Sequence, residues 1–116
     1  MRRILQQLNR EVGVKGSMVV SPDGLVVMAE LGEGIDEEVV AAMASNTIVS
    51  TKRALSLCGH EKFDRLILTA AHGKMVFVDI ELAYLLVLTD KNINIDFTLL
   101  EIDGAAHRIR NTWKIE

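Results

Sequence analysis

Residues 37–59 read EEVVAAMASNTIVSTKRALSLCG, and this stretch decides the fold. Asp36 suits the N-cap of a helix, and the acidic Glu37 and Glu38 suit its positive end. Gly59 suits the position just after the last turn. The stretch therefore predicts one long helix. Most of its side chains are apolar or small, whereas a surface helix of a monomer has a broad polar face.

At about 100° per residue, this helix has two apolar sectors on nearly opposite sides. The first, which we expect to face a sheet, contains Val39, Ala42, Met43, Val49, Ala54 and Leu57. The second contains Val40, Ala41, Ala44, Ile48, Leu55 and Cys58, with Thr47 and Thr51 at its margin. Between them lies a narrow polar strip of Glu38, Ser45, Lys52 and Ser56.

Asn46 and Arg53 fit this assignment poorly, because both fall in the sector that we expect to face the sheet. Either they mark where that sector extends beyond the sheet into a second interface, or the rotation is wrong by some tens of degrees. A simpler alternative is that Lys52 and Arg53 are the basic residues favoured near a helix C-terminus.

The second sector predicts an interface, since nothing else in the chain is left to cover it and an exposed apolar face of this size marks a contact. Its small residues would let another helix approach closely, and the same helix of a second copy is the simplest candidate. We expect a homodimer or a close heterodimer. The predicted contacts on the helix are Val40, Ala44, Thr47, Ile48 and Thr51.

On either side of the long helix, the sequence alternates between helix and strand patterns. Residues 1–12 and 99–113 have apolar residues at helical spacing, although Gly104 costs the second helix roughly 1 kcal/mol relative to Ala. Two apolar runs at 16–20 and 25–30 flank Ser21-Pro22-Asp23-Gly24, which predicts a β-hairpin with a type I turn. Three further strands are predicted at 63–71, 74–80 and 83–89, antiparallel because their connections are short.

The strands are nearly continuous apolar runs such as LILTAA, MVFVDI and YLLVL, which is typical of strands covered on both faces. We therefore predict an α+β fold of three layers, formed by residues 1–116 as a single domain. The first and last helices share one face of the sheet, and the long helix covers the other. The run containing Leu66, Ile67 and Leu68 has no Pro or Lys to block pairing, so at a sheet edge it would accept a partner strand.

Composition limits the classes of function. The chain has 116 residues, 49% of them hydrophobic and 25% charged, and a formal net charge of -3, which argues against nucleic acid or an anionic membrane as the main partner. Cys58 is the only cysteine, so the chain suits a reducing compartment such as the cytoplasm. No run is long enough to predict insertion into a membrane.

No constellation of residues predicts chemistry. Cys58 and His60 are two possible metal ligands, but a structural zinc site needs about four, and we expect Cys58 to be buried. His72 and His107 have no supporting catalytic motif, and no glycine-rich phosphate loop is complete. We expect no catalytic, cofactor or metal site, and therefore no enzyme.

Three stretches together resemble the roadblock/dynein light chain domain family: GVKGSMVVSPDGLVV at 13–27, the alanine-rich helix, and YLLVLTDKNINI at 84–95. The chain is most similar to the bacterial and archaeal single-domain type. The resemblance implies a five-stranded antiparallel sheet whose third strand is an edge. It also implies a two-fold dimer formed by that strand and the long helix, which would pair Leu66, Ile67 and Leu68.

The resemblance implies a non-enzymatic, homodimeric regulator or scaffold that binds a small Ras-like GTPase and modulates its nucleotide state. We expect the GTPase on the groove between the two long helices, at Glu38, Ser45, Lys52 and Ser56. Two alternatives stay open: a profilin-like or longin-like small-molecule sensor, with methionines lining its cavity, or a purely structural assembly subunit. Stabilisation of the isolated protein by a ligand would favour the sensor.

Overall fold

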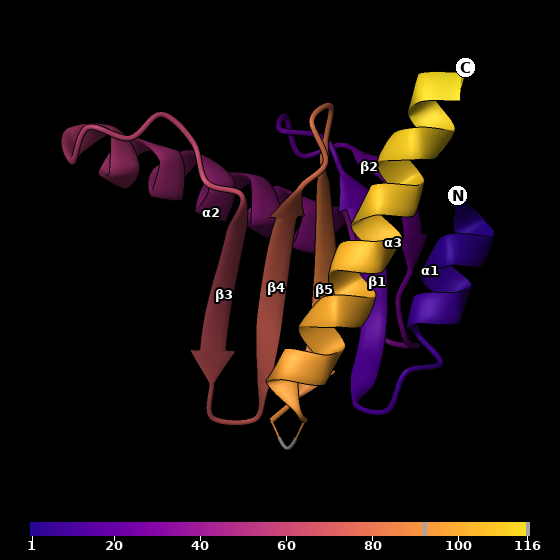
Figure 1. Cartoon of the computed structure of the whole chain (residues 1–116). Coiled ribbons are helices and arrows are strands. Elements are labelled where there is room, and N and C mark those ends of the chain that lie inside the picture. The colour runs from indigo at the N-terminus through magenta and orange to yellow at the C-terminus, as the bar shows by residue number, and fades with distance from the viewer. Residues whose placement is uncertain (92, 116) are drawn as a thin grey trace.

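The computed structural model describes residues 1–91 and 93–115 (Figure 1). Its helices are α1 (Arg2–Leu8), α2 (Glu37–Leu57) and α3 (Ile95–Ile115). Its strands are β1 (Val14–Val20), β2 (Val26–Glu30), β3 (Arg65–Ala70), β4 (Gly73–Asp79) and β5 (Tyr84–Asp90). The strands form one antiparallel sheet in the order β2-β1-β5-β4-β3. The fold prediction is confirmed: α1 and α3 lie on one face of the sheet and α2 lies on the other.

The hairpin of β1 and β2 forms around the predicted turn. The amide of Gly24 donates to the carbonyl of Ser21 at 3.0 Å, as in a type I turn, and Gly24 has a φ of +88° that L side chains rarely adopt. The hydroxyl of Ser21 also accepts a hydrogen bond from the amide of Leu25. Local turn chemistry therefore sets the register of the first two strands.

Two apolar cores lie on the two faces of the sheet, because successive side chains of a strand point to opposite faces. On the side of α1 and α3, the buried residues include Leu5, Val19, Leu85, Ile102 and Ile109. On the side of α2, they include Met18, Phe77, Leu86, Ala44 and Ile48. Both faces of β1, β4 and β5 are covered, which explains the continuous apolar runs in their sequences.

The boundaries of the outer helices differ from the prediction. α1 ends at Leu8, and residues 9–13 form turns that leave Val12 exposed. α3 begins earlier, at Ile95, where the side chain of Asn94 accepts a hydrogen bond from the amide of Phe97. A capping asparagine sets the start of α3 independently of the apolar spacing.

Both ends of α2 match the prediction. The Asp36 carboxylate accepts hydrogen bonds from the amides of Glu38 and Val39. At the other end the amides of Gly59 and His60 donate to the carbonyls of Ser56 and Leu55, and Gly59 has a φ of +87°. This pair of bonds is a Schellman motif, which satisfies the last carbonyls of a helix.

The rotation of α2 corrects the sequence analysis. Ala41, Ala44 and Ile48 are buried against the sheet, whereas Val39 and Met43 are exposed. The two apolar sectors are therefore exchanged, and the predicted rotation is wrong by about half a turn. The two misfit residues, Asn46 and Arg53, lie on the exposed side of the helix, which removes the difficulty they posed.

Close approach between α2 and the first hairpin explains this rotation. A side chain carbon built on Gly24 would lie 3.2 Å from the Cβ of Ser45 and 3.5 Å from the carbonyl oxygen of Ala41. At such a distance the facing side of a helix accepts small residues, and the larger Met43 and Val49 would hold it away from the sheet. The small residues Ala41, Ala44 and Ser45 thus pack within the chain. This corrects the prediction that they let another helix approach closely.

Candidate functional site

The outer face of α2 is exposed and largely apolar. Met43 is 61% exposed and Leu57 is 86% exposed, and the spacing of the exposed residues follows one side of the helix. This outer face consists of Val39, Ala42, Met43, Asn46, Val49, Ser50, Arg53, Ala54 and Leu57. An exposed apolar stripe interrupted by a few polar side chains is typical of a helix that packs against a partner.

Two of the five predicted dimer contacts on α2 are buried within the chain. Ala44 and Ile48 are fully buried, and Val40, Thr47 and Thr51 are half-buried. The hydroxyl of Thr47 donates within the helix to the carbonyl of Met43. The prediction that Ala44 and Ile48 face outward is wrong, because these side chains fill the core between α2 and the sheet.

The third strand is an edge, as the resemblance implied. β3 pairs only with β4 and lies at the end of the sheet. Leu66 is half-buried, and Ile67 and Leu68 are exposed, as are Thr69 and Ala70. The outward backbone groups of this strand are therefore open to pairing, and no proline or lysine lies within it.

The C-terminal end of α2 and the edge of β3 lie on the same side of the molecule (Figure 1). α2 has 21 residues, so its axis is about 31 Å long, whereas five strands span about 19 Å. The helix crosses the sheet, and its last turns extend beyond β3 (Figure 1). The exposed end of the helix, with Leu57 and Cys58, therefore lies beside the open edge strand.

The four residues of the predicted GTPase strip differ in how far they are exposed to solvent. Glu38 and Ser56 are exposed, whereas Ser45 is half-buried beside the first hairpin. Lys52 is also half-buried, and its ammonium lies 5.2 Å from the centre of the Tyr84 ring. Only two of the four side chains are thus fully available to a partner on this flank of α2.

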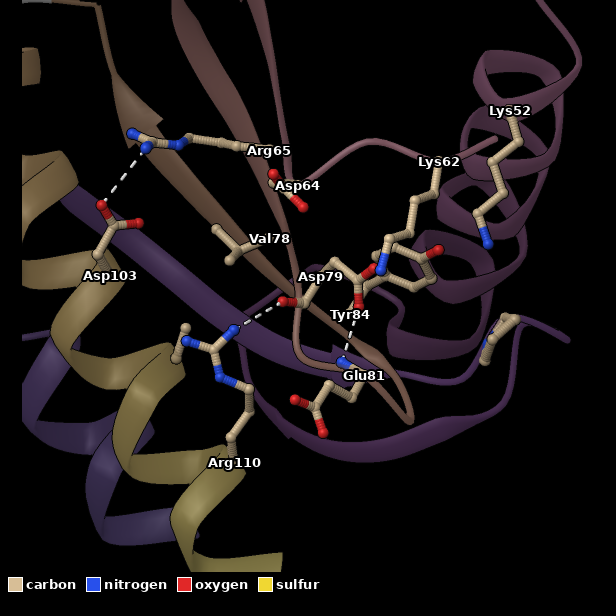
Figure 2. Close-up of a pocket in the computed structure, with 12 residues that line it drawn as sticks. Lys52, Lys62, Asp64, Arg65, Val78, Asp79, Glu81, Tyr84, Asp103 and Arg110 are labelled. Atoms are coloured by element: carbon tan, nitrogen blue, oxygen red, sulfur yellow. Dashed lines mark hydrogen bonds and ion pairs between the residues drawn. The ribbon is translucent and has the colours of Figure 1, made fainter. Parts of the chain in front are cut away.

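A pocket of about 620 Å³ lies beyond this flank, where α2, β3, the β4–β5 turn and α3 meet (Figure 2). Figure 2 shows Lys52 and Lys62 extending toward Tyr84 from different elements. Tyr84 is only 3% exposed, and its ring packs against Phe63 with 5.6 Å between the ring centres. No pattern in the sequence indicated this pocket, because its residues come from segments far apart in the chain.

Eight charged side chains line this pocket, four of each sign. Some of these charges are already engaged. Arg65 pairs with Asp103 at 3.4 Å, Arg110 donates to the carbonyl of Asp79, and the Asp79 carboxylate accepts a hydrogen bond from the amide of Glu81. The pocket is polar, and no methionine lines it, so the methionine-lined cavity expected of a sensor is not at this place.

Other candidate groups show no comparable arrangement. Cys58 is exposed at the end of α2, so the expectation that it is buried is wrong. Residues 1–91 and 93–115 contain no cluster of three or more His, Cys, Asp or Glu side chains arranged to hold a metal ion. In that same part of the chain, no helix has the length and apolar character required to cross a membrane.

The fold and the sequence identify the class of protein. Residues 2–90 match the model of the Roadblock/LC7 domain, from α1 to the end of β5. The chain therefore belongs to the Roadblock/LC7 domain family.

The chain is also similar to individual proteins. The chain is 39% identical to the uncharacterized protein MJ0714 of Methanocaldococcus jannaschii over 108 residues, which cover 93% of this chain and 92% of that protein. Among solved structures, Myxococcus xanthus MglB is similar with a TM-score of 0.92 at 14% identity, covering 99% of this chain and 95% of its own. A Roadblock/LC7 domain from Streptomyces avermitilis has a TM-score of 0.88 at 14% identity, with 98% of both chains covered. At these identities the two structures show a shared fold.

Proposed function

We propose that this protein is a non-enzymatic, cytoplasmic homodimer that binds a small Ras-like GTPase and modulates its nucleotide state. The observation that carries the self-association is the apolar outer face of α2 beside the unpaired edge of β3. Membership of the Roadblock/LC7 family supports the regulatory role, because the resemblance of the sequence implied such a partner.

The dimer that we propose uses the unpaired edge of β3 and the exposed side of α2 together. β3 of one protomer pairs with β3 of the other across a two-fold axis, which continues the sheet through Leu66, Ile67 and Leu68. The outer faces of the two α2 helices then pack together through Met43, Val49 and Leu57. This arrangement keeps the predicted elements of the interface and replaces the buried Ala44 and Ile48 with exposed residues of α2.

The two α2 helices would present the GTPase with a surface that neither protomer has alone. Glu38 and Ser56 are exposed on the flank of each helix and remain our candidates for this contact, together with Lys52 and Ser45 at its inner margin. The mechanism would be conformational: the dimer favours one arrangement of the switch region of the GTPase, whose own residues carry out hydrolysis.

The test uses the purified protein and a small Ras-like GTPase from the same organism, loaded with GDP or with a non-hydrolysable GTP analogue. We expect binding to one nucleotide state and a change in the GTP hydrolysis rate. Met43→Glu, which places a charge on the outer face, should abolish both effects by preventing dimerisation. Glu38→Lys and Lys52→Glu should weaken the complex and leave the dimer intact. Equal binding by wild type and Met43→Glu would exclude the dimer as the binding unit, and no binding in either nucleotide state would refute the GTPase role.

A further inference from the structure

The pocket beside α2 contains a buried aromatic residue whose hydroxyl has no hydrogen-bond partner among the described residues. The side chain of Tyr84 is almost completely buried, and it lines the pocket. Within residues 1–91 and 93–115, its hydroxyl makes no hydrogen bond, yet no buried polar side-chain atom is left unsatisfied. The hydroxyl oxygen must therefore reach the open volume of the pocket, where it can donate to or accept from a ligand.

Two lysines extend toward the Tyr84 ring, and neither makes an ion pair among the described residues. Lys52 contacts the face of the Tyr84 ring, and Lys62 approaches from the connection between α2 and β3 (Figure 2). Neither ammonium is part of an ion pair, whereas Arg65 on the same pocket is paired with Asp103. A carboxylate placed between Lys52 and Lys62 would accept hydrogen bonds from both ammoniums and from the Tyr84 hydroxyl.

The opposite charge is also available in the same pocket. The carboxylates of Asp64 and Glu81 line the pocket and accept no hydrogen bond from any described side chain. Figure 2 shows the two carboxylates on different sides of Asp79, with Asp64 on the side of Lys62. An ammonium group would be attracted to Asp64, whereas a purely anionic ligand such as phosphate would be repelled by it. The balance of four cationic and four anionic side chains therefore favours a ligand that has both charges.

Backbone strain points to the same place. Glu81 has a φ of +77° and is the only non-glycine residue with a positive φ among residues 1–91 and 93–115. The conformation costs about 1–3 kcal/mol, and such strain collects at functional sites. The amide of Glu81 is fixed by the Asp79 carboxylate at 2.7 Å, which holds the strained turn at the rim of the pocket.

We propose that this pocket binds a free α-amino acid. The α-carboxylate lies between Lys52, Lys62 and the Tyr84 hydroxyl, and the α-ammonium lies toward Asp64. The volume of about 620 Å³ falls in the range of pockets that enclose small ligands. This site goes beyond the proposed GTPase regulation and does not depend on it.

The test measures thermal stabilisation of the isolated protein by each of the common L-amino acids at about 10 mM, followed by titration calorimetry of those that bind. Acetate, ethylamine and inorganic phosphate are the probes with a single kind of charge. We expect stabilisation by one or more amino acids and none by these probes. No stabilisation by any amino acid would overturn the proposal, and equal stabilisation by acetate or phosphate would show an anion site only, which overturns it as well.

Three variants locate the site. Tyr84→Phe keeps the ring against Phe63 and removes the hydroxyl, and Lys62→Met removes one ammonium from an exposed connection. Each should weaken binding at least about tenfold, because each removes a hydrogen bond to a charged group. Lys91→Met, the same change on an exposed lysine outside this pocket, should leave the affinity unchanged. Unchanged affinity in both Tyr84→Phe and Lys62→Met would place the ligand elsewhere and refute the site. Since no GTPase is present, this result is independent of the proposed function.

Discussion

The hydroxyl of Ser45 in α2 donates a hydrogen bond of 2.7 Å to the carbonyl oxygen of Pro22 in the β1–β2 turn. This bond joins the middle of the long helix to the first hairpin, at the point where Gly24 leaves room for it. It therefore helps to fix which face of α2 meets the sheet.

Removal of this bond tests that role. Ser45→Ala should lower the free energy of unfolding by about 0.5–1.5 kcal/mol, because the Pro22 carbonyl loses its donor. Ser50→Ala is the matched control, since Ser50 is exposed on the outer face of the same helix, and it should change stability by less than about 0.5 kcal/mol. Urea unfolding of both variants measures the difference, and equal effects would show that the bond contributes nothing to stability.

Because the two faces of α2 are exchanged, a glutamate should have different effects at a buried and at an exposed position of the helix. Ile48→Glu buries a charge in the core beside α2, so the protein should unfold or lose several kcal/mol of stability. Met43→Glu places the charge on the exposed outer face and should give a folded monomer. Light scattering over a range of concentrations, together with circular dichroism, separates the two outcomes. A folded monomer from Ile48→Glu would restore the rotation expected from the sequence.

The edge strand gives an independent test of self-association. Leu68→Lys introduces a residue that natural edge strands use to prevent pairing, at a side chain that is 40% exposed. We expect the dimer to dissociate at least about tenfold more readily, with little change in the stability of the monomer. Leu100→Lys, an exposed leucine on α3, is the control and should keep the dimer. Dissociation of the Leu100→Lys dimer to the same extent would contradict an interface at β3.

Two glycines should respond in opposite ways to the same substitution. A Cβ at Gly104 meets nothing within 4 Å, so Gly104→Ala should stabilise α3 by about 1 kcal/mol and raise Tm by about 4 °C or more. A Cβ at Gly73 would lie 2.3 Å from the carbonyl oxygen of Thr89, so Gly73→Ala should destabilise the pairing of β4 with β5. Thermal unfolding of both variants measures the signs. A loss of stability in Gly104→Ala would mean that the helix is not continuous there.

The strained turn predicts a conflict between stability and binding. Glu81→Gly relieves a backbone with φ of +77° and should raise the free energy of unfolding by roughly 0.5–1 kcal/mol. Leu82→Gly, one residue further, gains no such relief and should lower stability. If the pocket binds amino acids, Glu81→Gly should also weaken that binding. A destabilised Glu81→Gly would show that the turn is not strained in solution.

Most of the fold could be predicted from sequence because the signals are local. Apolar runs placed the strands, Ser21-Pro22-Asp23-Gly24 placed the first turn, and Asp36 with Gly59 bounded α2. The rotation of α2 could not be predicted in this way, since both of its sectors are apolar. Asn46 and Arg53 were the residues that pointed to the correct rotation, because a polar side chain rarely faces a covered sheet.

The pocket could not be predicted for a different reason. Its residues, such as Lys52, Asp64, Glu81 and Arg110, come from four separate segments of the chain. Each is an ordinary charged residue in its own segment. Only the topology brings them around the Tyr84 hydroxyl, and the strained φ of Glu81 has no signature in the sequence.

Because α2 is longer than the sheet is wide, it has an anchored part and a projecting end. Ala41, Ala44 and Ile48 hold the helix against the sheet, and its last turns project beyond β3. Lys52 lies between the buried part of the helix and this projecting end, so one helix supplies both a lining residue of the Tyr84 pocket and the surface proposed for a second copy.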